Sequence, residues 1–377
     1  MYGPLFFCVV SEREPMKHGN SGTMDRLVER VQAENIRKHD FISPTGVMTA
    51  SDVYGEPRLN FRVNRGSDET TSFNLEQVAH ENLSQLCGID MRYYRKLLEL
   101  PSKELWATNV NQWLPGVSNR TVRTFDGEYE DDLGMRSTGS VRCLMSDRYW
   151  CLDNSDLLAA LIPQFEKREL TVLTSNLSER HMVIKAVSPK MIADVPHVGD
   201  RVQGGIAVGN SEVGQGSLWI TEYDYVLSCT NGMVGEKERK YTHRSGKSGE
   251  DDSNFSSYSS ETKRKTNEAF WAQIAEDIDR CFDEERFAVR VSNYGDAAAD
   301  EVHENQEARV ISTVCSESGV PKDDWDKVLR HYHRGGQESR WGVAQAVTRY
   351  AQDVEDFDLA TSLESVGRKV MDGGLYR

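Results

Sequence analysis

The 377-residue sequence lacks the features that identify membrane, secreted and zinc-stapled proteins. It has no run of about eighteen apolar residues, which excludes a membrane-spanning helix. Its seven cysteines are scattered and odd in number, and no C-x-x-C pair occurs. This argues against a disulfide framework and against a structural zinc site. We therefore expect a protein of a reducing cytoplasm that holds no metal and no cofactor.

The N-terminus lacks the pattern of a secretory signal. Residues 1–10 are apolar, but they have neither a basic n-region nor a small-residue cleavage site. The polar stretch that follows offers nothing to pack against a core, and Met24 opens a plausible helix. We interpret residues 1–23 as a disordered leader or an over-extended gene start.

Positive charge is scarce in the chain as a whole. The formal net charge is −15, of which residues 250–377 carry −11 from 27 acidic and 16 basic side chains. Overall acidity argues against nonspecific binding to duplex DNA. One basic island stands out against this background. Residues 237–247 hold five basic side chains and one acidic side chain, a local charge of +4.

Apolar periodicity divides the rest of the chain into three parts. Residues 24–116 predict an N-terminal helical part. Residues 117–259 alternate with period two and have short connections, which predicts an antiparallel sheet, with a mobile basic loop at 236–259. Residues 260–377 predict a helical region whose first helix runs unbroken to Phe287. The fold class expected is therefore α+β, with N-terminal helices, a central twisted antiparallel sheet and a C-terminal helical region.

Glycine gathers in the stretch that precedes the most aromatic strand. Gly209 and Gly214 have the G-x-x-x-x-G spacing of a phosphate loop, but Gln215 replaces its lysine and a strand follows instead of a helix. We therefore predict a tight turn, whose motif residues are Asn210, Ser211, Glu212 and Gly214. An Asn-Gly pair predicts a second turn, with motif residues Cys229, Thr230, Asn231 and Gly232.

Nucleophilic catalysis and metal binding find little support in the sequence. Cys229 paired with His243 as a base would need a third residue to orient the pair, and none is apparent. The other histidines have no ligand-like spacing. We assign no catalytic residue and no metal ligand.

Basic and aromatic side chains gather around the predicted sheet and its loop. A flexible basic loop beside such a sheet suits single-stranded nucleic acid, through phosphate pairing and base stacking. The alternative is that these side chains only keep a sheet face soluble. The candidate nucleic-acid-binding residues are Lys237, Arg239, Lys240, His243, Arg244, Lys247, Lys263, Arg264, Lys265, Arg148 and Tyr149. Further arginines on the adjoining strands are Arg120, Arg123, Arg136 and Arg142.

Several motifs resemble a family of phage- and plasmid-borne proteins of unknown function. The matching pieces are SDRYWCLDNSDLL (146–158), GNSEVGQGSLWI (209–220), CTNGM (229–233) and WGVAQAVTRYA (341–351). The resemblance implies a mobile-element origin and, through association with phage recombination genes, a role in DNA metabolism. It transfers no catalytic residue. Gln345 stands where relatives tend to carry asparagine.

These observations favour a non-enzymatic protein that binds or anneals single-stranded DNA during phage or plasmid replication. Such proteins usually form rings or filaments, so we expect a homo-oligomer, with phage or plasmid recombination proteins as partners and no membrane. Two alternatives stay open. One is an enzyme whose polar pocket is formed by the two predicted turns together. The other is an inhibitor whose acidic C-terminal third mimics DNA and blocks a host nuclease.

Overall fold

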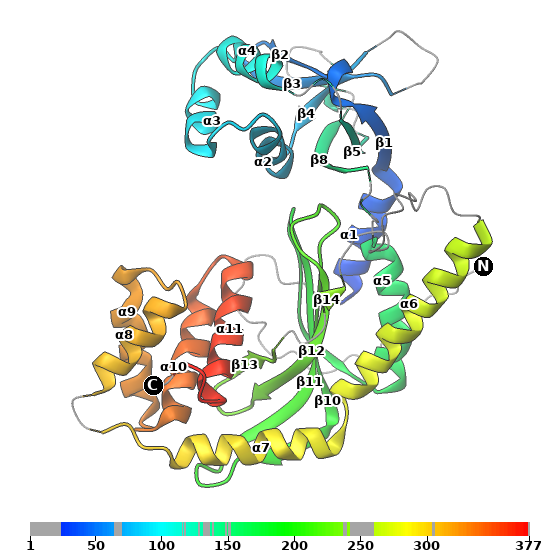
Figure 1. Ribbon diagram of the computed structural model, residues 1–377. Coiled ribbons are helices and arrows are strands. Elements are labelled where there is room, and N and C mark those ends of the chain that lie inside the picture. The colour runs from blue at the N-terminus through cyan, green and yellow to red at the C-terminus, as the bar shows by residue number, and fades with distance from the viewer. Residues whose placement is uncertain are drawn as a thin grey trace, which may run out of the picture.

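In the part of the chain that the structure describes, two six-stranded sheets and a two-stranded ribbon are accompanied by helices (Figure 1). The computed structural model describes residues 24–63, 70–114, 116, 118–126, 129–130, 136–137, 139–147, 149, 152–236, 240–241, 260–303 and 306–375. Helices precede and follow a curled antiparallel sheet, which confirms the α+β class. The predicted leader at 1–23 and nearly all of the predicted mobile loop at 236–259 lie outside the described residues.

The first sheet belongs to the N-terminal part of the chain and has the strand order β1-β5-β8-β4-β3-β2. Its neighbouring strands are antiparallel except for β4 and β8, which are parallel. One face packs against α2, α3 and α4 through a core that includes Phe61, Tyr94, Trp106 and Val141. The elements are β1 (Lys38–Pro44), η1 (Thr45–Val47), β2 (Thr49–Val53), β3 (Glu56–Phe61), β4 (Thr71–Leu75), α2 (Gln77–Leu86), α3 (Met91–Leu98), α4 (Glu104–Trp113), β5 (Asn119–Phe125) and β8 (Ser140–Ser146).

The helices predicted within residues 24–116 are present as α1 to α4, but strands β1 to β4 lie among them and were not predicted. The glycines and prolines before Pro57 predict a loop, but Tyr54 and Gly55 both have positive φ and make the tight turn of a β2–β3 hairpin. Pro57 lies near the start of β3, where a strand tolerates proline. Leu59 and Phe61 then alternate into the core. Strands β5 and β8, expected in the central sheet, complete this N-terminal sheet instead.

The second sheet is antiparallel and has the strand order β13-β12-β11-β10-β9, with the short β14 also paired to β12. A separate two-stranded ribbon joins β6 and β7. The elements are β6 (Tyr129–Glu130), β7 (Arg136–Ser137), β9 (Thr171–Leu177), β10 (Met182–Asp194), β11 (Arg201–Asn210), β12 (Leu218–Val226), β13 (Asn231–Val234) and β14 (Lys240–Tyr241).

Helices cover both faces of this second sheet (Figure 1). Side chains alternate along each strand, so Ile184 and Ile220 join a core with α1, α5 and α6, whereas Val183 and Trp219 face α11. The buried Phe357 at the start of α11 packs in this second core. The helices concerned are α1 (Met24–Arg37), α5 (Asn154–Lys167), α6 (Ser260–Cys281), α10 (Arg340–Asp353) and α11 (Phe357–Met371).

The remaining helices connect α6 to α10: α7 packs against β10 and α10, and α9 packs against α8 and α10. The prediction of one helix that runs unbroken to Phe287 is wrong, because α6 ends at Cys281 and a new helix begins at Glu284. Asp283 accepts a hydrogen bond from the backbone N–H of Arg286 and thereby caps the second helix. These elements are α7 (Glu284–Ala299), α8 (Glu307–Glu317), η3 (Lys322–Asp324) and α9 (Trp325–Gly335).

Candidate functional site

The first glycine-rich turn lies at the junction of the two sheets, where its polar side chains are buried. Asn210, Ser211 and Glu212 are each at most 4 % exposed. Asn210 donates from Nδ2 to the carbonyl oxygen of Leu152 and to Oδ1 of Asn154, each at 2.8 Å. Gly214 has a φ of +76°, as a turn glycine often does. The predicted turn is present, but it faces the protein interior.

Glu212 is the centre of a buried ionic cluster that joins the N-terminal sheet to the rest of the chain. Its carboxylate lies 3.2 Å from Nη1 of Arg142 and 3.7 Å from Nη1 of Arg123, and it accepts the backbone N–H of Asn154 at 2.5 Å. Lys38 lies 3.7 Å from the same carboxylate. The cluster therefore ties β1, β5 and β8 to the start of α5.

Arg123 and Arg142 serve this junction and are withdrawn from solvent. Arg123 is fully buried and forms ion pairs with Asp40 at 2.8 Å and with Asp153 at 3.0 Å. Burial alone would raise the pKa of Asp153, but Arg123 and Lys38 lower it below its ordinary value. The expectation that these two arginines decorate an accessible sheet face is corrected, because burial removes them from any external phosphate.

The second predicted turn anchors α10. Thr230 has a φ of +56°, and Asn231 already belongs to β13, so the turn lies slightly before the Asn-Gly pair that predicts it. Asn231 donates from Nδ2 to Oε1 of Gln345 at 2.7 Å and to Oγ1 of Thr348 at 2.5 Å. The amide of Gln345 therefore completes a buried hydrogen-bond network between two of the motifs that carry the family resemblance.

The two turns lie at opposite ends of β12. One precedes Leu218 and the other follows Val226, and eight residue steps along a strand span roughly 26 Å. The hypothesis of a single polar pocket formed by both turns is therefore wrong. His243, the proposed base for Cys229, lies outside the described residues.

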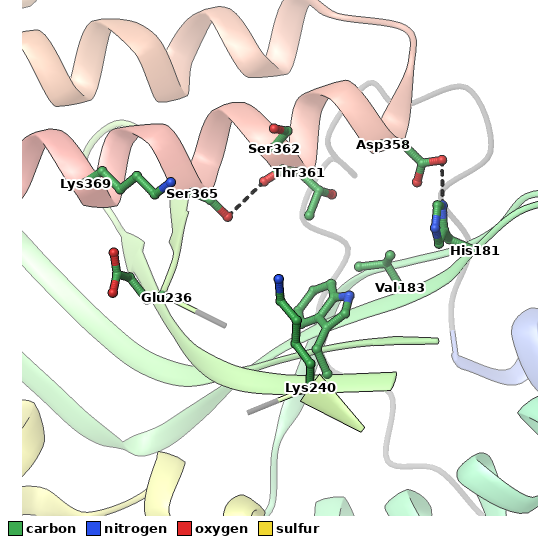
Figure 2. Close-up of a pocket in the computed structure, with 11 residues that line it drawn as sticks. His181, Val183, Glu236, Lys240, Asp358, Thr361, Ser362, Ser365 and Lys369 are labelled. Carbon is green, nitrogen blue, oxygen red and sulfur yellow. Dashed lines mark hydrogen bonds and ion pairs between the residues drawn. The ribbon is translucent and has the colours of Figure 1, made fainter. Parts of the chain in front are cut away.

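A cleft lies between β12 and α11 (Figure 2). It has a volume of about 460 Å³. Lys240 on β14 and Lys369 on α11 both line it, together with Trp219 from β12 and Ser362 from α11. Neither lysine has an ion-pair partner among the described residues. We refer to this cavity as the Lys240–Lys369 cleft.

Buried ion pairs fix α11 as one wall of this cleft. Glu364 and Lys185 lie 2.5 Å apart, and both are almost fully buried between α11 and β10. Desolvation raises the pKa of Glu364, although Lys185 opposes the shift. Arg368 donates from Nη1 to Asp224 of β12 at 2.9 Å. Because these side chains hold one face of α11 against the sheet, the neighbouring positions 361, 365 and 369 face the cleft.

His181 closes one end of the cleft. Its Nδ1 lies 2.9 Å from Oδ2 of Asp358 (Figure 2). Its Nε2 lies 3.4 Å from the carbonyl oxygen of Gln215. A serine nucleophile would need its hydroxyl within hydrogen-bond reach of the histidine. Both ring nitrogens of His181 are directed at other groups, so the nearby Ser362 does not complete a catalytic triad.

Among the predicted nucleic-acid-binding residues that the structure describes, Lys240 lines the cleft. Tyr149 donates its hydroxyl to the carbonyl oxygen of Ser211 at 3.2 Å and so supports the junction turn. Lys263, Arg264 and Lys265 belong to the first turns of α6. The predicted residues that lie outside the described part of the chain are Lys237, Arg239, His243, Arg244, Lys247 and Arg148.

Sequence reasoning missed the α11 wall and His181. The signal on α11 is a polar stripe at Asp358, Thr361, Ser362, Ser365 and Lys369, spaced so that all five lie on one side of a helix. Such a stripe is also typical of a solvated helix face. Only the packing of α11 against β12 distinguishes the two interpretations.

Several acidic side chains of the C-terminal third are engaged with the protein itself. Asp300 pairs with Arg340, Asp353 with His331, and Asp356 caps α11 by accepting backbone N–H groups. These contacts give the acidic side chains roles in folding, so the acidity alone does not indicate a surface that mimics DNA.

No helix in the part of the chain that the structure describes is long and apolar enough to cross a membrane. Within those same residues, no group of three or more histidine, cysteine, aspartate or glutamate side chains is arranged to hold a metal ion. Comparison of the chain with protein-family models, with curated proteins and with solved structures gave no match. The resemblance to phage and plasmid proteins therefore stays a prediction, and the geometry of the Lys240–Lys369 cleft carries the functional argument.

Proposed function

We propose that this chain is a non-enzymatic protein that binds single-stranded nucleic acid through the Lys240–Lys369 cleft. The observation that supports this most directly is that two lysines from different elements face one cavity without ion-pair partners among the described residues. Lysine ammonium groups that face a cavity in this arrangement attract phosphate oxygens. The hydroxyl groups of α11 add hydrogen-bond donors on the same side.

The charge around the cleft favours an anion only modestly, which suits a ligand bound by several weak contacts. Glu236 also faces the cleft, and Asp358 is engaged by His181. In the sequence, the segment between Glu236 and Lys240 consists of Lys237, Glu238 and Arg239, which are two basic side chains and one acidic side chain. A polymer with repeated phosphates would gain from these cations together, whereas a single isolated anion would not.

The predicted role in replication or recombination of a mobile element belongs to the same proposal. A protein that coats or anneals single strands acts stoichiometrically and needs no catalytic group. Self-association into rings or filaments would align successive clefts along one strand. The size of the protein in solution, measured by light scattering with and without oligonucleotide, tests this part.

Fluorescence anisotropy of a labelled oligothymidylate across a salt series tests the binding. Replacing Lys240 or Lys369 by alanine should weaken binding and lower the slope of log K against log salt by about 0.7 for each phosphate that the variant no longer neutralises. Lys190→Ala is the matched control. Lys190 lies on β10, is exposed and pairs with Glu169. The proposal fails if the parent protein shows no binding at low salt, or if Lys369→Ala behaves like Lys190→Ala.

A further inference from the structure

The floor of the Lys240–Lys369 cleft is aromatic. Trp219 on β12 pairs in register with Gly209 on β11. A Cβ atom added to Gly209 would lie 2.3 Å from the indole ring, so the ring covers the glycine and depends on its lacking a side chain. Val183 from β10 extends the apolar floor. Trp219, at 7 % exposure, and Val183 therefore form the apolar part of the cleft lining.

The opposite wall presents a buried hydroxyl group that lacks a partner. Thr361 is 4 % exposed and lines the cleft, and its Oγ1 has no hydrogen-bond partner among the described residues. Ser365 donates to the backbone carbonyl of Thr361 and leaves this hydroxyl unused (Figure 2). Ser362 lines the cleft one residue further along α11. A buried polar atom without a partner is costly, so a ligand that bonds to Thr361 would remove a penalty.

These three features occur together in one space. An aromatic floor suits a planar ring, two ammonium groups suit a phosphate, and a hydroxyl wall suits the polar groups of a sugar or a base. The volume of about 460 Å³ lies within the range of roughly 300 to 1,000 Å³ that is usual for small-ligand sites. A phosphate ion alone would leave the floor uncovered.

We infer that the cleft binds a single nucleotide unit, with its base against Trp219 and its phosphate between Lys240 and Lys369. Thr361 donates to, or accepts from, the nucleotide at the α11 wall. This inference rests on the site of the proposed function and sharpens it: one base of the strand is lifted into the cleft while the rest of the strand follows the surface. A free mononucleotide is then a ligand in its own right.

Isothermal titration with thymidine 5′-monophosphate, thymidine and inorganic phosphate tests the inference. We expect the monophosphate to bind at least tenfold more tightly than either fragment, because each fragment fills only part of the site. Thr361→Val should weaken monophosphate binding about fivefold, the worth of one net hydrogen bond, and Thr361→Ser should restore it. Thr171→Val, on the exposed start of β9, is the control and should leave binding unchanged.

The variants also guard against a folding artefact. Thr361→Val and Thr361→Ser should share the thermal midpoint of the parent within a few degrees, so a difference in binding between them reports the hydroxyl. Equal affinity for the monophosphate and for inorganic phosphate would overturn the inference, as would unchanged binding by Thr361→Val.

Anisotropy with oligothymidylate, run in parallel, separates the two proposals. Binding of the oligonucleotide that depends on Lys240, without binding of the monophosphate, overturns the nucleotide cleft alone. Binding of the monophosphate without binding of the oligonucleotide supports the cleft and overturns the single-strand function.

Discussion

Glu212→Gln is the substitution that tests the structural role of the first glycine-rich turn. The change keeps the shape of the side chain and an oxygen that can accept the N–H of Asn154, but it removes the charge that faces Arg123 and Arg142. Removing one partner of a buried ion pair typically lowers the free energy of unfolding by about 3 to 5 kcal/mol. The charges left behind determine where in this range the variant falls.

Both arginines retain other carboxylates after the substitution. Arg123 still pairs with Asp40 and Asp153, and Arg142 still lies 3.1 Å from Glu34. The positive charges are therefore not left bare, and we expect the low end of the range, a loss of about 3 kcal/mol in the free energy of unfolding. Lys38, which retains Asp153 at 2.9 Å, should contribute little to the loss.

Urea unfolding followed by circular dichroism measures the effect. Glu169→Gln is the control, since Glu169 and Lys190 form an exposed pair whose loss should leave the urea midpoint unchanged within error. A Glu212→Gln protein that unfolds at the parent's midpoint with the parent's slope would refute the reasoning. It would mean that the cluster does not hold the junction and that Glu212 is free for another task.

Two further predictions concern the second sheet and its helices. Gly232→Ala should destabilise the protein by about 1 to 3 kcal/mol, because its Cβ would lie 1.9 Å from the hydroxyl of Tyr223. Gly335→Ala, which meets nothing within 4 Å, should be neutral or slightly stabilising in the same thermal-shift assay, and equal midpoints for the two variants would contradict the packing argument. Burial alone would raise the pKa of Asp224, but Arg290 and Arg368 hold that pKa below its ordinary value of 3.8. The ionised carboxylate therefore stabilises the fold above pH 3.8, and this contribution is lost as pH falls through the folded-state pKa. The stability deficit of Asp224→Asn relative to the parent should therefore shrink below about pH 4 in urea titrations, and a deficit that stays constant from pH 6 to pH 3 would show that the charge is not its cause.

Periodicity predicted the elements whose apolar faces are regular. Leu27 and Val31 are the buried residues of α1, and Gly88, at a φ of +64°, follows the end of α2 in the left-handed conformation that glycine accepts. Asp90 caps α3 by accepting the N–H groups of the next turn. These features depend on neighbours within a few residues, so the local sequence is sufficient to predict them.

The N-terminal strands escaped prediction because their pairing is non-local. β1 pairs with β5 across about eighty residues of chain, with Asp40 opposite Arg123. β4 pairs with β8 through a contact of similar range. Short segments interrupted by glycine and proline carry too little periodicity to predict such partners, so the sheet emerges only when the whole N-terminal part folds.

The turn that contains Glu212 shows the same division between local and tertiary information. The local sequence determined that residues 210–214 form a turn, because glycine and asparagine accept its backbone angles. It did not determine that the turn is buried, since Arg123 and Arg142 lie on strands about seventy to ninety residues earlier. An acidic turn on a glycine-rich stretch looks accessible until the opposing arginines are in place.

The sequence by itself determined the α+β class, the central antiparallel sheet and the place of Lys240 within a basic stretch of the sequence. Tertiary structure alone decided which polar residues form buried contacts inside the protein and which face a cleft. Lys369, Thr361 and Trp219 come together because buried ion pairs press α11 onto the sheet over Gly209. Those contacts join residues more than a hundred positions apart, and no local pattern encodes their meeting.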